Sequence, residues 1–142
     1  MLDAIGRSVT ALRARIDALA ASDRPGTVIV AIMTDGYENA SVEWTYPAIK
    51  KLIEQQEQQH DWMFLYMGAD QDAIEVGAKM GIARGQTLTF DRDTSGGAYE
   101  AMAASVSAYR AAPGAPPAER RAAAAFSEEQ RRAARSAEKP GS

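Results

Sequence analysis

The chain has 142 residues, of which 46% are hydrophobic and 25% are charged, and its formal net charge is −3. These values are typical of one globular domain with a modest core, and no run of about 18 apolar residues exists that could form a membrane segment. The sequence contains no cysteine and one histidine, His60, which excludes disulfide frameworks, thiolate zinc sites, cysteine nucleophiles and histidine metal clusters.

The charge is unevenly distributed along the chain. From Pro113 onward, six basic and four acidic residues give a segment of +2, so the preceding part carries −5. An acidic body does not attract a phosphate backbone, and we expect no nucleic-acid partner. The first residues form neither a basic leader nor a cleavage site, so we expect a cytoplasmic protein with no membrane partner.

The first predicted element is an amphipathic helix. Its apolar residues recur at intervals of three and four: Leu2, Ile5, Val9, Leu12, Ile16 and Leu19. This spacing predicts one face packed on a core. Breakers at 22–26 end the helix, and the run Thr27–Met33 follows with six apolar residues out of seven. A continuous apolar run is typical of a central parallel strand that is buried on both faces.

A carboxylate comes directly after this strand. Asp35 and Gly36 stand where open α/β sheets bind ligands, at the carboxyl edge, and Gly36 allows a sharp turn. Asp35 is therefore the first candidate for a functional residue. The spacing alone favours ordinary turn chemistry, since Asp and Gly dominate such connections.

The middle of the chain predicts a second helix and a second strand. Thr45 is a suitable N-cap because Pro47 falls in the first turn, and the buried stripe consists of Ile49, Leu52 and Ile53. The aromatic and apolar run Trp62–Met67 predicts the strand.

Asp70 follows the second strand and allows two interpretations. It either caps a helix over 71–80 or faces the same crevice as Asp35. We favour the cap, because Asp is among the best N-cap residues. Gly81 is the expected C-cap of that helix.

The last part of the chain predicts a short strand at Thr87–Phe90 and a helix capped by Thr94 or Ser95. The apolar face expected for this helix consists of Tyr99, Met102, Val106 and Tyr109. Proline and glycine then break regular structure at 112–117. The segment 112–142 offers only Phe126 as a large apolar anchor, so we expect a mobile or weakly helical tail.

Helices and strands alternate along the whole sequence. This order predicts right-handed crossovers and an α/β fold with three Rossmann-like layers, in which about three parallel strands are flanked by helices. The expected domain spans 1–111 and the tail spans 112–142. A sheet of three strands leaves an edge with unpaired backbone groups.

The residues Val28–Asn39 resemble the strand and third metal-site loop of von Willebrand factor A (vWA) domains. The resemblance, to the bacterial intracellular kind in particular, covers about residues 2–110. Trp62–Asp72 resembles the next strand with its loop, and Phe90–Arg110 resembles the closing helix. It implies a partial vWA domain, the carboxyl-terminal part only, without the first strand.

In vWA domains a magnesium ion at the carboxyl edge helps to grip an acidic group of a protein partner. The resemblance carries one ligand over, onto Asp35, and makes the following residues candidates for the binding loop: Thr34, Gly36, Glu38, Asn39 and Asp70. The family's Asp-x-Ser-x-Ser motif does not occur in the 142 residues. We therefore expect weak or absent Mg²⁺ binding, because one carboxylate supplies few of the six oxygen ligands.

Three functional hypotheses follow. The leading one is a protein-binding, vWA-like module with an incomplete metal-ion-dependent adhesion site and no enzymatic activity, paired with an unknown protein or with a missing half-domain. A metal-free scaffold or degenerate fragment that forms a homodimer through its exposed strand edge is the alternative. A metal-assisted hydrolase built on Asp35, Glu38 and Asp70 lacks both a glycine-rich phosphate loop and a nucleophile elbow.

Overall fold

Three parallel strands form the sheet, and the chain visits them in spatial order. The structure is a computed structural model that describes residues 1–35 and 40–135. The strands β1 (Ile29–Thr34), β2 (Met63–Ala69) and β3 (Thr87–Phe90) lie in the order β1-β2-β3. Ile29 lies opposite Met63, and Tyr66 lies opposite Thr87. The predicted α/β fold with three parallel strands is confirmed.

The central strand is β2 rather than β1. All of β2 is buried, whereas β1 is half-buried and its Ala31 is exposed. The prediction that Thr27–Met33 is central and buried on both faces is therefore wrong for this sheet. A continuous apolar run indicates that both faces of a strand are covered by helices, but it does not reveal how many strands lie beside it.

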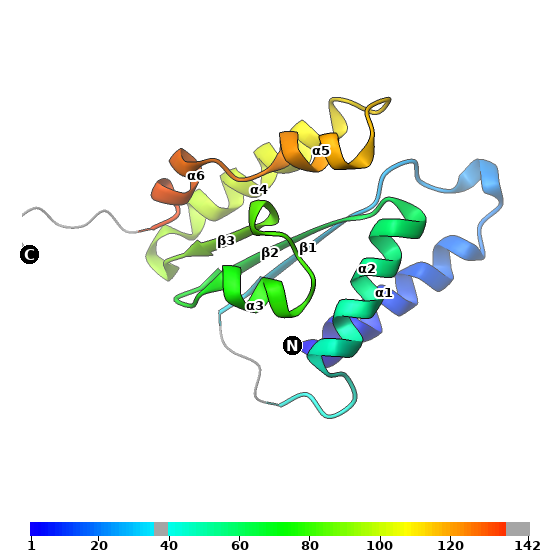
Figure 1. Cartoon of the computed structure of the whole chain (residues 1–142), viewed down its shortest axis with the longest axis horizontal. Helices are drawn as coiled ribbons and strands as arrows, with labels where there is room; N and C mark the ends of the chain where they lie inside the picture. Colours follow the sequence, from blue (N-terminus) through cyan, green and yellow to red (C-terminus); the bar gives the residue numbers. More distant parts are fainter. Residues whose placement is uncertain (36–39, 136–142) are drawn as a thin grey trace, which may run out of the picture.

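Helices cover both faces of the sheet (Figure 1). One face carries α1 (Leu2–Asp17), α2 (Tyr46–His60) and α3 (Ala73–Lys79), and the other carries α4 (Ser95–Arg110), α5 (Pro117–Ala124) and α6 (Glu128–Ala133). Short 3-10 turns occur at η1 (Ala21–Asp23), η2 (Arg84–Gln86) and η3 (Arg92–Thr94). Successive side chains of β2 alternate between two core clusters, as strand geometry requires. Of the helices in the described ranges, none is long and apolar enough to cross a bilayer.

Helix α1 packs through most of its predicted apolar face. Leu2, Ile5, Val9 and Ile16 are buried, while Leu19 lies beyond the helix end and is 43% exposed. The residue Gly6 lies on the same face, where the indole of Trp44 sits so close that a Cβ atom on residue 6 would lie 2.2 Å from it. The missing side chain at Gly6 thus leaves room for Trp44, in the segment that leads into α2.

The helix caps agree with the sequence at one position and differ at another. The Thr45 side chain accepts a hydrogen bond from the Ala48 N–H, as predicted. Helix α3, however, is capped by Asp72, whose carboxylate accepts from the Glu75 N–H at 3.1 Å. The favoured assignment of Asp70 as the cap is wrong, because Asp70 adopts a left-handed conformation with φ of 52° two residues earlier. Gly81, at φ of 76°, directly follows the C-cap of α3, close to its predicted role.

Helix α4 packs through most of its predicted apolar face. Tyr109 is buried and Met102 and Val106 are partly buried against the core, whereas Tyr99 is 55% exposed. The other buried positions of the helix are small residues that the prediction did not include: Ala98, Ala101 and Ser105. Small residues form this face because α5 and α6 pack closely on it, and a carbonyl of Ala133 lies only 2.7 Å from where a Cβ atom on Gly97 would be.

The segment after residue 112 is docked more firmly than expected. Helices α5 and α6 lie over α4, and Phe126 is buried (Figure 1). Arg120 supplies the anchor that composition did not reveal. Its guanidinium stacks on the Tyr109 ring at 4.1 Å, donates to the Tyr109 carbonyl and reaches Thr27 Oγ1 at 3.3 Å. A loosely held tail was expected because Phe126 is its one large apolar residue. The buried guanidinium of Arg120 is a polar anchor, which a count of apolar residues does not include.

Candidate functional site

Two predicted site residues meet at the carboxyl edge of the sheet through one arginine. The Arg92 side chain donates from Nη2 to the Asp35 carbonyl oxygen at 2.7 Å, and its Nε lies 3.0 Å from Asp70 Oδ2. Asp70 therefore pairs with Arg92 at the carboxyl edge of the sheet and does not cap α3. Arg92 was not among the predicted site residues, because those at this edge were chosen as carboxylates and their neighbours, whereas β3 contributes a cation two residues after its end.

The backbone around Asp70 is held by hydrogen bonds. Its N–H donates to the Phe90 carbonyl at 2.9 Å, which ties the end of β2 to the end of β3. The next residue, Gln71, turns back so that its Oε1 accepts from the Tyr66 hydroxyl at 2.8 Å. This side chain lies over Gly68, where a Cβ atom would come within 2.6 Å of it. The left-handed turn at Asp70 is thus fixed by β2 and β3 together.

The donors that the described residues place at this edge do not fit a magnesium ion. Among residues 1–35 and 40–135, no three acidic or histidine side chains lie close enough together to hold a metal. The Asp70 carboxylate is paired with a guanidinium, which a divalent cation would have to displace. The other proposed loop residues Gly36, Glu38 and Asn39 lie outside the described residues. Thr34 ends β1, next to Asp35.

Helix α1 anchors the chain where it returns from the loop after β1. The Asp3 carboxylate accepts hydrogen bonds from the N–H groups of Val42, Glu43 and Trp44 at 2.8 to 3.0 Å. These bonds, with that from Val42 foremost, hold the pKa of Asp3 below its ordinary value although partial desolvation opposes them. Arg7 adds an ion pair with Glu43 at 2.9 Å. No sequence pattern indicates these contacts, since Asp3 and its partners lie about forty residues apart.

The outer edge of β1 is open. The Met63 N–H donates to the Val28 carbonyl, and backbone groups alternate along a parallel strand, so those of Ile29, Ala31 and Met33 point away from β2. In the described part of the chain β1 pairs with β2 alone. Its edge therefore presents unpaired donors and acceptors to a further strand.

Apolar side chains border this open edge on both faces of the sheet. Val28, Val30 and Ile32 pack against the core under α1, whereas Ile29 and Met33 pack against the core under α4. All five remain half-exposed. Two grooves open at the amino end of β1. One of about 410 Å³ lies between α1 and the residues Val28 and Ile29, and one of about 500 Å³ extends from Ile29 to Val106 and Arg110 of α4.

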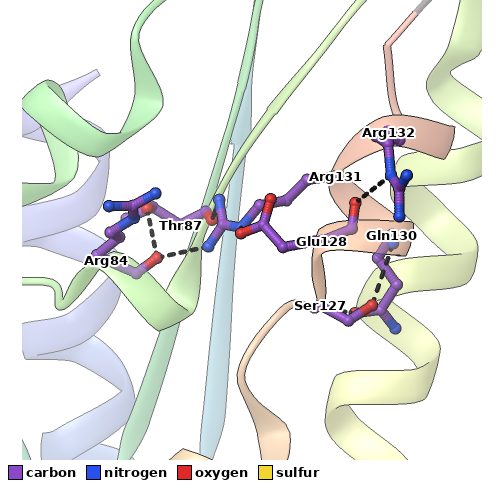
Figure 2. Close-up of polar contacts among 7 residues, drawn as sticks. All are labelled: Arg84, Thr87, Ser127, Glu128, Gln130, Arg131 and Arg132. Atoms are coloured by element: carbon purple, nitrogen blue, oxygen red, sulfur yellow. Dashed lines mark hydrogen bonds and ion pairs between the residues drawn. The ribbon is translucent and has the colours of Figure 1, made fainter.

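The opposite edge of the sheet is covered. Arg131 of α6 extends across β3, donating from Nη1 to the Thr87 carbonyl at 3.0 Å and from Nη2 to the Arg84 carbonyl at 2.9 Å (Figure 2). A cation placed over an edge strand satisfies its carbonyls and prevents pairing with another chain. The two edges of this sheet therefore differ: α6 covers the edge of β3, whereas the edge of β1 is open.

Comparisons with known proteins identify no relative. No family model matches the chain, and no curated protein or solved structure matches it either. The vWA resemblance therefore stays a prediction.

Proposed function

We propose that this protein is a protein-binding module that accepts a strand of another polypeptide along the open edge of β1. One observation carries the proposal: β1 is a half-buried, apolar strand whose outer edge pairs with no other strand in residues 1–35 and 40–135, while α6 covers the edge of β3. Main-chain hydrogen bonds would supply affinity, and apolar contacts on both faces would select the strand.

The chemistry of the edge defines the kind of strand that fits it. Because both faces beside β1 are apolar, the incoming strand has to be apolar on both of its own faces. Such strands belong to the interior of an α/β sheet, so the partner we infer is a folded segment that completes this sheet. The vWA resemblance leads to the same partner, a half-domain with the strand that neighbours Thr27–Met33. The proposal requires no metal ion.

The test uses a strand probe and an edge-blocking variant. The probe is a lysine-flanked peptide that repeats the β1 sequence Val28–Met33, added to the labelled protein at increasing concentration. We expect binding to slow hydrogen exchange of the Ala31 amide by about tenfold or more. The variant Ala31→Pro should abolish binding, because proline removes an outward N–H without removing a bond to β2.

Matched variants at the same position keep the test interpretable. Ala31→Val leaves the N–H in place and should bind as the wild type does. Ala31→Lys adds a charge to the exposed position and should weaken pairing, even if the proline variant fails to fold. Equal binding by wild type, Ala31→Pro and Ala31→Lys, or no binding at all, would contradict the proposal.

Self-association is a second candidate, favoured by the fact that each copy presents the same edge. Two antiparallel β1 strands related by a two-fold axis would join two sheets into one. Sedimentation at increasing protein concentration separates the two candidates. A dimer that Ala31→Pro abolishes and that a chelator leaves intact would indicate a metal-free scaffold, whereas a monomer that binds the peptide would indicate a different partner.

A further inference from the structure

A basic pocket lies along the edge of β3, on the opposite side of the sheet from the open edge of β1. Its volume is about 230 Å³, and its walls come from α3, η2, β3 and the α6 region: Ile74, Arg84, Thr89, Glu128, Arg131, Arg132 and Arg135. The binding site proposed at β1 does not use any of these residues. The pocket therefore carries a separate inference.

The lining of the pocket carries more positive than negative charge. Four of the lining residues are arginines and one is a glutamate, in a chain whose net charge is −3. The Glu128 carboxylate is 79% exposed, and its Oε1 lies 4.0 Å from Arg131 Nε, a weak pair. The site thus has an excess of guanidinium groups over carboxylates.

Arg131 is held rigidly at the centre of this cluster. Figure 2 shows its side chain extended from α6 toward the carbonyl groups of Arg84 and Thr87, and it is 16% exposed. Burial lowers the pKa of Arg131, the nearby Glu128 raises it, and the charges of Arg84 and Arg135 lower it further. Three like charges close together are stabilised when an anion binds between them.

We propose that this pocket binds a compact oxyanion, namely the phosphate group of a small phosphorylated compound. Guanidinium groups match phosphate oxygens with paired N–H donors, and the exposed side chains of Arg84, Arg132 and Arg135 are available from different sides. Thr89 Oγ1 accepts from the Ala73 N–H, so its own hydroxyl proton can be donated to the ligand. Ile74 supplies an apolar wall.

The size of the pocket and the charge of the molecule restrict the ligand. Sites for drug-sized ligands have about 300–1,000 Å³, so a pocket of about 230 Å³ suits a phosphate or diphosphate group rather than a large cofactor. A polynucleotide would require a continuous basic surface, whereas the part of the chain before Pro113 carries −5.

Calorimetric titration with inorganic phosphate and with pyrophosphate at low ionic strength tests this proposal. We expect pyrophosphate to bind more tightly, because its two phosphate groups can engage several arginines. The double variant Arg84→Gln with Arg135→Gln should weaken binding by about tenfold for each lost charge-assisted bond. Both side chains are exposed, so the fold should persist, and an unchanged circular dichroism spectrum and melting temperature would verify this.

The control is Arg15→Gln on α1, which removes one exposed arginine from the other face of the sheet. It should bind both anions as the wild type does. Loss of affinity of the same size in Arg15→Gln and in the folded double variant would show a general charge effect and overturn the proposal. Absence of heat with both anions at millimolar concentration would overturn it as well.

Discussion

Asp3 shows how one side chain can determine the path of a distant loop. Its carboxylate, in the first turn of α1, accepts three N–H groups from residues 42–44. Its own N–H donates to Ser41 Oγ. Because an ionised carboxylate accepts these bonds more strongly than a neutral one, these contacts depend on charge.

This dependence predicts a pH effect on stability. Asp3 has a lower pKa in the folded chain than in the unfolded chain, so its contribution is present above the unfolded value and is lost as pH falls through the folded value. The melting temperature of Asp3→Asn should therefore lie below that of the wild type at neutral pH, and the difference should shrink between about pH 4 and pH 2.

Thermal melts at a series of pH values measure this difference directly. The control is Asp23→Asn, an exposed aspartate in η1 for which no comparable loss is expected. A gap between wild type and Asp3→Asn that stays constant down to pH 2 would mean that the shape of the side chain matters and its charge does not.

At the scale of single elements, α1 departs from helix propensity for a packing reason. Alanine normally stabilises a helix by about 1 kcal/mol over glycine. At Gly6, however, the added Cβ atom would collide with the Trp44 indole at 2.2 Å. We expect Gly6→Ala to lower the free energy of unfolding by about 1–3 kcal/mol, the usual cost of overpacking.

The matched control for this change is Gly96→Ala at the start of α4, where a Cβ atom would meet open space. It should raise stability by about 0.4–1 kcal/mol. Urea denaturation of both variants tests the sign. Stabilisation by Gly6→Ala would show that Trp44 can move aside at little cost.

The contact of α6 with the edge of β3 also predicts an effect on stability. Arg131→Met keeps the aliphatic stem but removes two hydrogen bonds, one of them to the carbonyl of Thr87, a fully buried residue. We expect a loss of about 1–3 kcal/mol in the free energy of unfolding. Arg132→Met, whose side chain donates only to the Glu128 carbonyl at 3.4 Å, should change it by less than about 0.5 kcal/mol. Urea denaturation of both variants provides the measurement, and equal losses would contradict the capping role of Arg131.

At the scale of the whole molecule, local patterns predicted the elements but not their neighbours. Apolar runs located β1 and β2, and β-favouring composition located β3. Thr45 was recognisable as a cap because the pattern around it is local. The position of β1 at the edge depends on contacts between segments far apart in sequence. The N-cap of α3 also depends on such a contact. Asp72 caps the helix and Asp70 does not, because the Phe90 carbonyl holds the turn at Asp70.

The candidate site was less predictable than the fold for a related reason. Sequence position placed Asp35 and Asp70 at one edge, and the structure brings both to Arg92. The arginine could have been found by asking which charged residues of either sign follow each strand. The packing of the carboxyl-terminal helices could not, because Arg120 is buried by stacking on an aromatic ring eleven residues earlier, a contact without a sequence signature.

The open edge of β1 also bears on how this protein behaves during production in a cell. Between Arg24 and Asp35 the chain has no charged residue that would keep one exposed strand from adhering to another. Newly made copies without a strand partner would be prone to form insoluble aggregates through this segment. A strand that pairs with β1 would cover this segment and lower the tendency to aggregate.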